Sequence, residues 1–450
     1  MFVLIVLTII AILLYINSPE GYSDNYTIYC LLTFLFSSII VLIKNCKDNI
    51  VKFEFFFLIA IFFTNYVYTV VYYQVNPYFS LFNLSFDESY ISKGLGLSTV
   101  GLCFFNLGVY DGKCCAFTKQ YNISSQLLFP KYLMIILSVV FIPYLFTLSL
   151  LGEYTTEFES SLINVVLVYL VYYTIYVFFA NRLSCNSLYE IVSSSLVNPF
   201  FWIISLYMVL FLIIGSRTIP LRIVFLSLIL YNCYIVKITK FKVLSICLLG
   251  AFFMTFVGLV RDGGNFTGDS VSSIWDLGKD LVINNRSLYV LMEYADVHGY
   301  NYGETMLSNI LSVFPFLQSI YLSLTGSTVS DISSGNLVTD LFFSENPNMK
   351  SFGLGTNLIG DIYVSFGVIG VAVLMFSLGF LLKKLYRLSC EGNHNALLIY
   401  ALLFMDVIYL PRSSFFTSLR SVTWVLFISY ICSYVHIYMG PVKKEANNLE

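Results

Sequence analysis

The only long polar stretch in this sequence begins with Arg261-Asp262-Gly263-Gly264 and ends with Gly353-Leu354-Gly355-Thr356-Asn357. An apolar run directly precedes the stretch and another directly follows it. The rest of the chain consists of apolar runs joined by short connectors. This arrangement predicts a loop, residues 261–353, that is fixed at both ends to one face of a bilayer.

Composition excludes an ordinary soluble protein. Of the 450 residues, 58% are hydrophobic and only 11% are charged, whereas soluble domains carry about 25% charged residues. The mean hydropathy is +0.81. We therefore predict an all-α polytopic integral membrane protein that forms a single transmembrane domain over residues 1–450. The net charge of −2 and the lack of a basic tract argue against nucleic acid as a partner.

Crossing the hydrocarbon core takes about 20 mostly apolar residues. On this criterion we predict twelve membrane spans. They lie near residues 1–17, 27–43, 53–73, 92–110, 132–150, 161–180, 199–214, 221–236, 243–260, 356–382, 395–411 and 422–440.

The connectors alternate in charge along the chain. Those after the even-numbered spans are rich in lysine, as at Lys44, Lys47 and Lys52, whereas the early connectors after odd-numbered spans have no lysine or arginine. Positive charge marks the cytoplasmic side of a membrane protein. Both termini are therefore expected in the cytoplasm, and the 261–353 loop, between spans 9 and 10, on the external face of the membrane.

Arginine and lysine are segregated by side. Six of eight arginines map outside, whereas thirteen of sixteen lysines map inside. Arginine differs from lysine in its planar fork, which binds phosphate or carboxylate through two parallel hydrogen bonds. External arginines at the membrane surface thus indicate a bound anionic headgroup or pyrophosphate. Alternatively, they pair with the ten acidic residues of the loop, which has a net charge of −6.

Three segments are expected within the loop. Residues 284–294 have the apolar spacing of a helix, which Gly299 would end. Residues 302–324 are apolar but interrupted by Pro315, so we expect a helix lying on or dipping into the outer leaflet. Residues 325–350 are rich in Ser, Gly, Asn and Asp, as expected of a mobile lid.

The segment from Gly353 to Gly370 carries the clearest chemical pattern. Glycines that precede a helix can leave backbone N–H groups open to an anion. Asp361 follows near the membrane boundary, where an ionisable side chain suggests a function. Gly360, Gly367 and Gly370 also permit close packing between helices, with or without such a function.

The sequence predicts chemistry without a metal or a cofactor. His298 is the only histidine expected outside, and no metal-binding motif is present. His298 is a candidate general base; alternatively it is a solvent-exposed loop histidine. Gly215-Ser216-Arg217, between spans 7 and 8, is either part of an anion site or a tight turn with an interfacial arginine.

These features together resemble the bacterial O-antigen polymerases of the Wzy type, the oligosaccharide repeat unit polymerases. The resemblance rests on twelve spans with one late external loop, on Gly215-Ser216-Arg217, on residues 286–315 with Tyr302-Gly303-Glu304-Thr305, and on the pattern G-x-G-x-x-x-x-G-[DE]-x-Y-x-x-F-G-x-x-G at Gly353–Gly370. The family often has Glu where this chain has Asp361, and Asn where it has Ser365.

The resemblance implies a membrane glycosyltransferase of the architecture that uses lipid-linked donors. It would transfer a growing glycan from undecaprenyl pyrophosphate onto a new lipid-linked repeat unit, with the bilayer, a flippase and a chain-length regulator as further partners. Arginines would stabilise the leaving pyrophosphate in place of a metal, and a carboxylate or imidazole would deprotonate the acceptor hydroxyl. The pyrophosphate candidates are Arg217, Arg261, Arg286 and Arg412; the base candidates are Asp361, Glu304 and His298.

Two other functions fit parts of this pattern. An O-antigen ligase uses the same donor but a different acceptor. A twelve-span lipid-glycan flippase or transporter would have ionisable residues deep in the bundle and two similar halves. Here Asp406 is the main charged residue within a span, and only the second half carries a long loop.

Overall fold

The computed structural model describes residues 1–47, 49–77, 86–111, 139–141, 143–144, 162–180, 199–214, 216, 218–245, 250, 282–347 and 353–439. Every regular element in these ranges is a helix, which confirms the all-α prediction. The chain divides into a larger unit, Met1–Phe117 with Lys237–Arg420, and a smaller unit, Thr118–Val236 with Ser421–Glu450. The single transmembrane domain stays a prediction.

Most predicted spans coincide with a helix. The larger unit contains α1 (Phe2–Ile16), α2 (Asp24–Asn45), α3 (Phe53–Asn65) with a π-helical turn η1 (Tyr68–Tyr72), α4 (Ser89–Val109), α17 (Leu358–Cys390) and α18 (His394–Met405). The smaller unit contains α7 (Leu162–Ala180), α9 (Pro199–Ile214), α10 (Thr218–Tyr234) and most of α19 (Leu419–Met439). The predicted spans 132–150 and 243–260 fall largely outside the described residues.

By length and apolar composition, two helices in the described part of the chain, α2 and α17, could each cross a membrane. The other apolar helices that coincide with predicted spans are mostly shorter. The count of twelve spans therefore stays a prediction. The eleventh predicted span continues to residue 411, whereas α18 ends at Met405 and a series of turns follows it.

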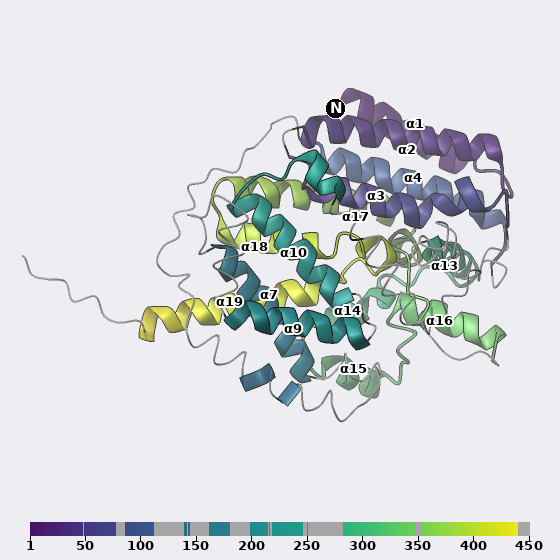
Figure 1. The fold of residues 1–450 in the computed structure, drawn as a ribbon. Coiled ribbons are helices and arrows are strands. Elements are labelled where there is room, and N and C mark those ends of the chain that lie inside the picture. Colours follow the sequence, from purple (N-terminus) through teal and green to yellow (C-terminus); the bar gives the residue numbers. More distant parts are fainter. Residues whose placement is uncertain are drawn as a thin grey trace, which may run out of the picture. The chain divides into compact units, whose positions relative to one another are not determined.

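Helices α4 and α17 pack against each other with their backbones in contact (Figure 1). A Cβ atom on Gly108 would lie 2.2 Å from the carbonyl oxygen of Phe376, and one on Gly379 would lie 2.4 Å from that of Phe105. Only glycine fits at such distances. Small residues serve membrane helices in this way because they let the backbones approach closely.

The helices of the larger unit alternate in direction. One end of the unit contains the last residues of α1, α3 and α18 and the first residues of α2, α4 and α17. The contacts that define this end are Tyr26 with Leu14, Asn357 with Asn65, Lys93 with Asp296, and Ser414 with Asp361. We call it the loop end, because α13 to α16 lie there. The alternation is the one that the connector charges predict for these spans.

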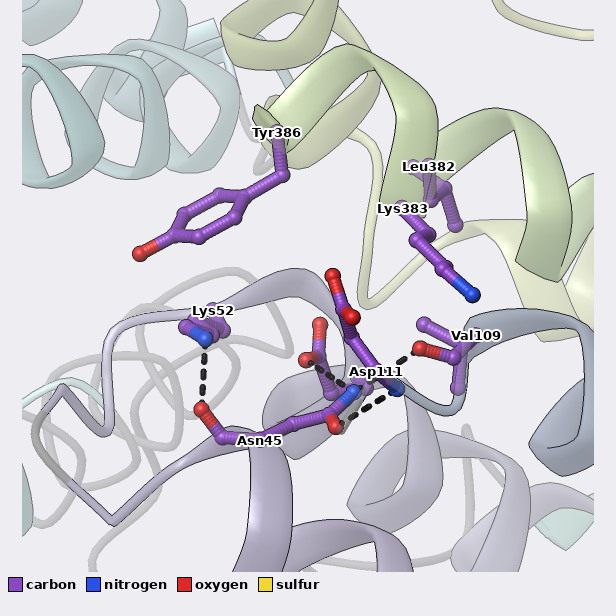
Figure 2. Close-up of a pocket in the computed structure, with 8 residues that line it drawn as sticks. Asn45, Lys52, Val109, Asp111, Leu382, Lys383 and Tyr386 are labelled. Carbon is purple, nitrogen blue, oxygen red and sulfur yellow. Dashed lines mark hydrogen bonds between the residues drawn. The ribbon is translucent and has the colours of Figure 1, made fainter. Parts of the chain in front are cut away.

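The opposite end, which we call the lysine end, is tied by Asn45 (Figure 2). Its side-chain amide donates to Glu54 Oε1 at 3.1 Å and to the Val109 carbonyl at 2.9 Å, and its Oδ1 accepts from the Asp111 N–H at 3.1 Å. The cavity beside it, lined also by Lys383 and Tyr386, encloses about 20 Å³, which is room for a single water molecule. The Asn45 hydrogen bonds therefore join helices at this end, and this cavity is too small to hold a sugar.

The described part of the loop, residues 282–347 and 353, contains five helical segments at the loop end. They are α13 (Asn284–His298), η5 (Glu304–Met306), α14 (Leu307–Leu311), α15 (Leu317–Thr325) and α16 (Ser334–Glu345). The helix predicted from Asn284 is confirmed, and Gly299 ends it with a φ of 87°. The interruption at Pro315 is also confirmed, since it lies between α14 and α15.

The mobile lid over residues 325–350 stays a prediction, but this segment contains a regular helix. The helix is α16, whose first turn is capped by the hydroxyl of Ser333. Val338 and Phe342 of this helix are fully buried. The many polar residues concealed an apolar face of only a few side chains, and that face packs against α13.

Candidate functional site

Three segments that are distant in sequence meet at the loop end. The Asn284 side-chain amide, at the start of α13, donates to the carbonyl oxygen of Leu354 at 2.9 Å. Gly355 has a φ of +72°, and a Cβ there would lie 2.7 Å from that amide nitrogen and 3.7 Å from the carbonyl oxygen of Arg412. The start of α13, the Gly353–Asp361 stretch and the segment that carries Arg412 therefore form one cluster.

The start of α17 is not an open anion site, contrary to the expectation from its glycines. Asn357 Oδ1 accepts from the N–H groups of Ile359 at 3.0 Å and Gly360 at 3.3 Å. The Asp361 N–H donates to the Asn357 carbonyl at 2.8 Å. Asn357 is itself held by the side chain of Asn65 at 2.8 Å. The N–H groups of residues 359–361 are thus already used by the N-cap residue.

Asp361 is completely enclosed by protein. Its Oδ2 accepts from Ser414 Oγ at 2.8 Å and from the Phe415 N–H at 3.0 Å. Its Oδ1 makes no hydrogen bond of standard geometry, although the Ser334 hydroxyl lies within interacting distance of the carboxyl group. A carboxylate in this position holds neighbouring chain in place and has no open path to a substrate hydroxyl.

The arginine candidates differ in their surroundings. Arg412 ends the short helix η6 (Leu410–Arg412) and is half-buried, with its guanidinium 5.8 Å from the centre of the Tyr409 ring. Arg286 lies in the first turn of α13, is only 1% exposed, and stacks 4.8 Å from the centre of the Phe342 ring. Arg217 and Arg261 lie outside the described residues.

His298 lies at the far end of α13 from Arg286. Twelve residues of helix separate the two, which is about 18 Å at the rise of an α-helix. The His298 ring is exposed and stacks on Tyr294 with centroids 4.3 Å apart, and its Nδ1 is 3.1 Å from the Tyr294 carbonyl oxygen. The structure therefore does not bring His298 and Arg286 together.

Glu304 is exposed and begins η5, which packs on α17 one turn beyond Asp361. The neighbouring Thr305 hydroxyl is 3.3 Å from Ser365 Oγ, and Ser365 Oγ in turn donates to the Asp361 carbonyl at 3.0 Å. Among the three base candidates, Glu304 is the one that is both exposed to solvent and close to this part of α17.

Helix α17 is interrupted at Gly367, which has φ 64° and ψ −160°. The carbonyl groups of Val364 and Ser365 would bond residues 368 and 369 in a regular helix. Here they accept instead from the N–H groups of Asn301 and Tyr302, each at 3.0 Å. The loop thus supplies the hydrogen bonds that the helix loses. Sequence reasoning assigned Gly367 to close packing and missed the interruption.

Three other contacts had no signal in the sequence. Lys93 Nζ forms an ion pair with Asp296 Oδ2 at 2.6 Å, and the Tyr363 hydroxyl donates to Asp296 Oδ1 at 2.9 Å. Ser418 Oγ donates to Asp406 Oδ2 at 2.7 Å.

Burial raises the pKa of Tyr289, beside Gly94, well above its usual range. This phenol therefore stays neutral and serves packing.

Comparison with known families assigns the chain. The family model described as O-antigen polysaccharide polymerase Wzy matches residues 1–442. Searches of curated proteins and of solved structures gave no match. The match covers nearly the whole chain and agrees with the helical architecture. The chain belongs to the Wzy family of O-antigen polysaccharide polymerases, and it is an integral membrane enzyme that polymerises O-antigen repeat units.

Proposed function

We propose that this polymerase uses undecaprenyl pyrophosphate as the carrier of its donor glycan. The growing glycan moves from that carrier to the non-reducing end of a new lipid-linked repeat unit. The bond between the anomeric carbon and the pyrophosphate oxygen breaks, a new glycosidic bond forms, and the acceptor hydroxyl loses its proton. No metal or nucleotide sugar takes part.

The meeting of Arg412, Gly355 and the start of α13 is the observation that carries this proposal. It brings the backbone of a half-buried arginine next to a glycine-rich turn at one end of the helices. A guanidinium stabilises the charge that develops on a leaving pyrophosphate, and it does so more strongly where water is partly excluded. Because Phe342 of α16 covers Arg286, Arg286 meets the pyrophosphate only when α16 shifts.

Glu304 is our first candidate for the general base. A base must reach the acceptor hydroxyl directly or through one water, and Glu304 is exposed whereas Asp361 is enclosed. His298 is the second candidate, since it is exposed at the same end of the unit. Arg217 and Arg261 remain proposed ligands of the pyrophosphate from the positions that the sequence gives them.

The loop end faces the periplasm in this proposal, and the lysine end faces the cytoplasm. Lys52, Lys383 and Arg387 gather at the lysine end, as the positive-inside rule requires. Both termini are then cytoplasmic, and the enzyme lies in the bacterial inner membrane. Repeat units must reach the periplasmic face, so a flippase supplies them, and a chain-length regulator is the second expected protein partner.

Helices α14 and α15 lie at the outer membrane surface in this proposal. Four apolar side chains in α15 and in the turn before it are largely exposed: Phe314 (62%), Phe316 (73%), Ile320 (51%) and Leu324 (81%). A pair of short helices with an exposed apolar face is suited to the boundary between headgroups and acyl chains. That position would guide a lipid-linked substrate toward the loop end.

An Arg412→Lys variant tests the proposal. Lysine keeps the charge but loses the two-pronged geometry, so we expect short polymer or single repeat units when the variant complements a deletion strain. Arg387→Lys is the matched control: Arg387 pairs with Asp111 at 3.6 Å at the lysine end, and its variant should give polymer of normal length. Normal polymer from Arg412→Lys and from Arg412→Ala would contradict the role of Arg412.

A further inference from the structure

We infer that Asp361 and Asp406 are positioning residues that hold the segment carrying Arg412 in place. We call this segment, residues 407–418, the arginine loop; it connects α18 to α19. The inference rests on the proposed function, because it assigns the two carboxylates a role that they exert through Arg412. Neither acts as the general base.

Asp406 ties the two ends of the arginine loop together. Its side-chain Oδ2 accepts from Ser418 Oγ at 2.7 Å, and its carbonyl oxygen accepts from the N–H groups of Tyr409 at 2.9 Å and Leu410 at 2.8 Å. Asp406 is only 1% exposed and directly follows the last residue of α18. In a twelve-span transporter, a carboxylate at the position of Asp406 would suggest a transport pathway. Here Asp406 instead closes a loop through its hydrogen bonds.

Asp361 ties the middle of the loop to α17. The two groups that it accepts from, Ser414 Oγ and the Phe415 N–H, come two and three residues after Arg412. Asp361 lies one turn into α17, whose start is fixed by the bond from Asn357 to Asn65. Asp361 therefore fixes the arginine loop to α17, the helix that also contains Gly360 and the interruption at Gly367.

The bonds within the loop are short-range. The N–H groups of Arg412, Ser413 and Thr417 each donate to the carbonyl group three residues earlier. Such turn bonds give the loop its local shape but do not fix where it lies against the rest of the protein. That placement depends on the two carboxylates and on the packing of the Arg412 carbonyl beside Gly355.

A carboxylate suits this task because one of its oxygens can accept two donors at once, as Asp361 Oδ2 does. Both side chains are buried, so water does not compete for Ser414 or Ser418. An arginine that must meet a pyrophosphate within a fraction of an ångström needs support of this kind.

Replacement of Asp361 by Asn separates positioning from proton transfer. An Asn side-chain oxygen can still accept from Ser414 and Phe415, whereas it cannot take a proton from the acceptor. For the full-length enzyme in lipid nanodiscs with lipid-linked repeat units, we expect kcat/KM of Asp361→Asn to stay within about threefold of wild type and that of Asp361→Ala to fall at least about tenfold. Asp406→Asn and Asp406→Ala should show the same contrast.

A double variant shows whether Asp361 acts through Arg412. If it does, adding Asp361→Ala to Arg412→Ala should change kcat/KM by less than about twofold, because residues that act as a unit are not additive. Ser414→Ala should lower kcat/KM about as much as Asp361→Ala does, whereas Ser389→Ala should leave kcat/KM unchanged. Ser389 is also a buried serine, and its hydroxyl donates to the Leu385 carbonyl of its own helix at 2.6 Å.

The outcomes separate this inference from the proposed function. An Asp361→Asn enzyme as inactive as Asp361→Ala would overturn positioning and restore Asp361 as a base. Full additivity of Asp361→Ala and Arg412→Ala would overturn action through Arg412 while leaving Arg412 as a ligand. Wild-type kinetics for Arg412→Ala would instead overturn the role of Arg412 in the proposed function, and the positioning role with it.

Discussion

The ring of Tyr300 lies against Gly367, the residue at which α17 leaves helical geometry. A Cβ atom on Gly367 would come within 2.8 Å of that ring. The loop residues that follow Tyr300 donate the hydrogen bonds that the interrupted helix lacks. The interruption is therefore built jointly by the helix and by the loop, so that the loop end and α17 form one structure.

Gly367→Ala should destabilise the enzyme. Its φ of 64° and ψ of −160° suit only glycine, and a residue held in such a region costs about 1–3 kcal/mol. We expect a lower midpoint of thermal unfolding in detergent and shorter polymer. Gly353→Ala is the control, since no atom lies within 4 Å of its Cβ position; an equal effect of both variants would contradict the assigned strain.

Gly379→Ala should separate α4 from α17. The added methyl group would meet the carbonyl oxygen of Phe105 at 2.4 Å, and backbone cannot move aside as a flexible side chain can. Overpacking of this kind costs about 1–3 kcal/mol. Gly335→Ala, whose nearest neighbour would lie at an ordinary 3.8 Å, should be tolerated. Thermal unfolding of both purified variants measures the difference, and equal midpoints would refute the close approach.

Asn45→Ala should loosen the lysine end without touching the chemistry. The variant leaves the Glu54 carboxylate, the Val109 carbonyl and the Asp111 N–H without their partner, and unsatisfied buried groups cost about 1–3 kcal/mol each. We expect a lower unfolding midpoint but normal polymer length at permissive temperature. Asn17→Ala, at an exposed asparagine that bonds only to Leu13 of its own helix, should leave the midpoint unchanged.

Tryptophan fluorescence tests the position of α15. With the three native tryptophans replaced by Phe, Leu324→Trp should be quenched by brominated lipids in nanodiscs, because its face would lie about 5–10 Å deep in the headgroup–acyl boundary. Ser319→Trp places the probe on the opposite side of the same helix and should be quenched much less. Equal quenching at both positions would place α15 away from the membrane surface.

Much of the architecture could be predicted because its signals are local. Apolar runs locate helices, and connector charge gives their alternating direction, which the contacts of α1 to α4, α17 and α18 reproduce. Gly299 and Pro315 act on their own neighbourhood, so the end of α13 and the break before α15 were also predictable. The α16 helix was missed because its apolar face is small and Ser-rich sequence surrounds it.

The site was predictable only as a set of residue types. Sequence pointed to arginines and to Asp361, but not to what each one touches. Asp361 bonds Ser414 across 53 positions, and Lys93 bonds Asp296 across 203. No periodicity or spacing encodes such pairs, because they depend on how helices pack once they have formed.

By itself, the sequence determined that the chain is a helical membrane protein, which way its helices alternate, and which segments carry polar chemistry. These properties follow from transfer of apolar groups out of water and from short-range backbone preferences. Only the tertiary structure decided that Asp361 is enclosed, that Asn357 closes the start of α17, and that Arg412 shares a cluster with Gly355. Burial and partner choice are set by long-range packing, and packing converts a candidate base into a support for an arginine.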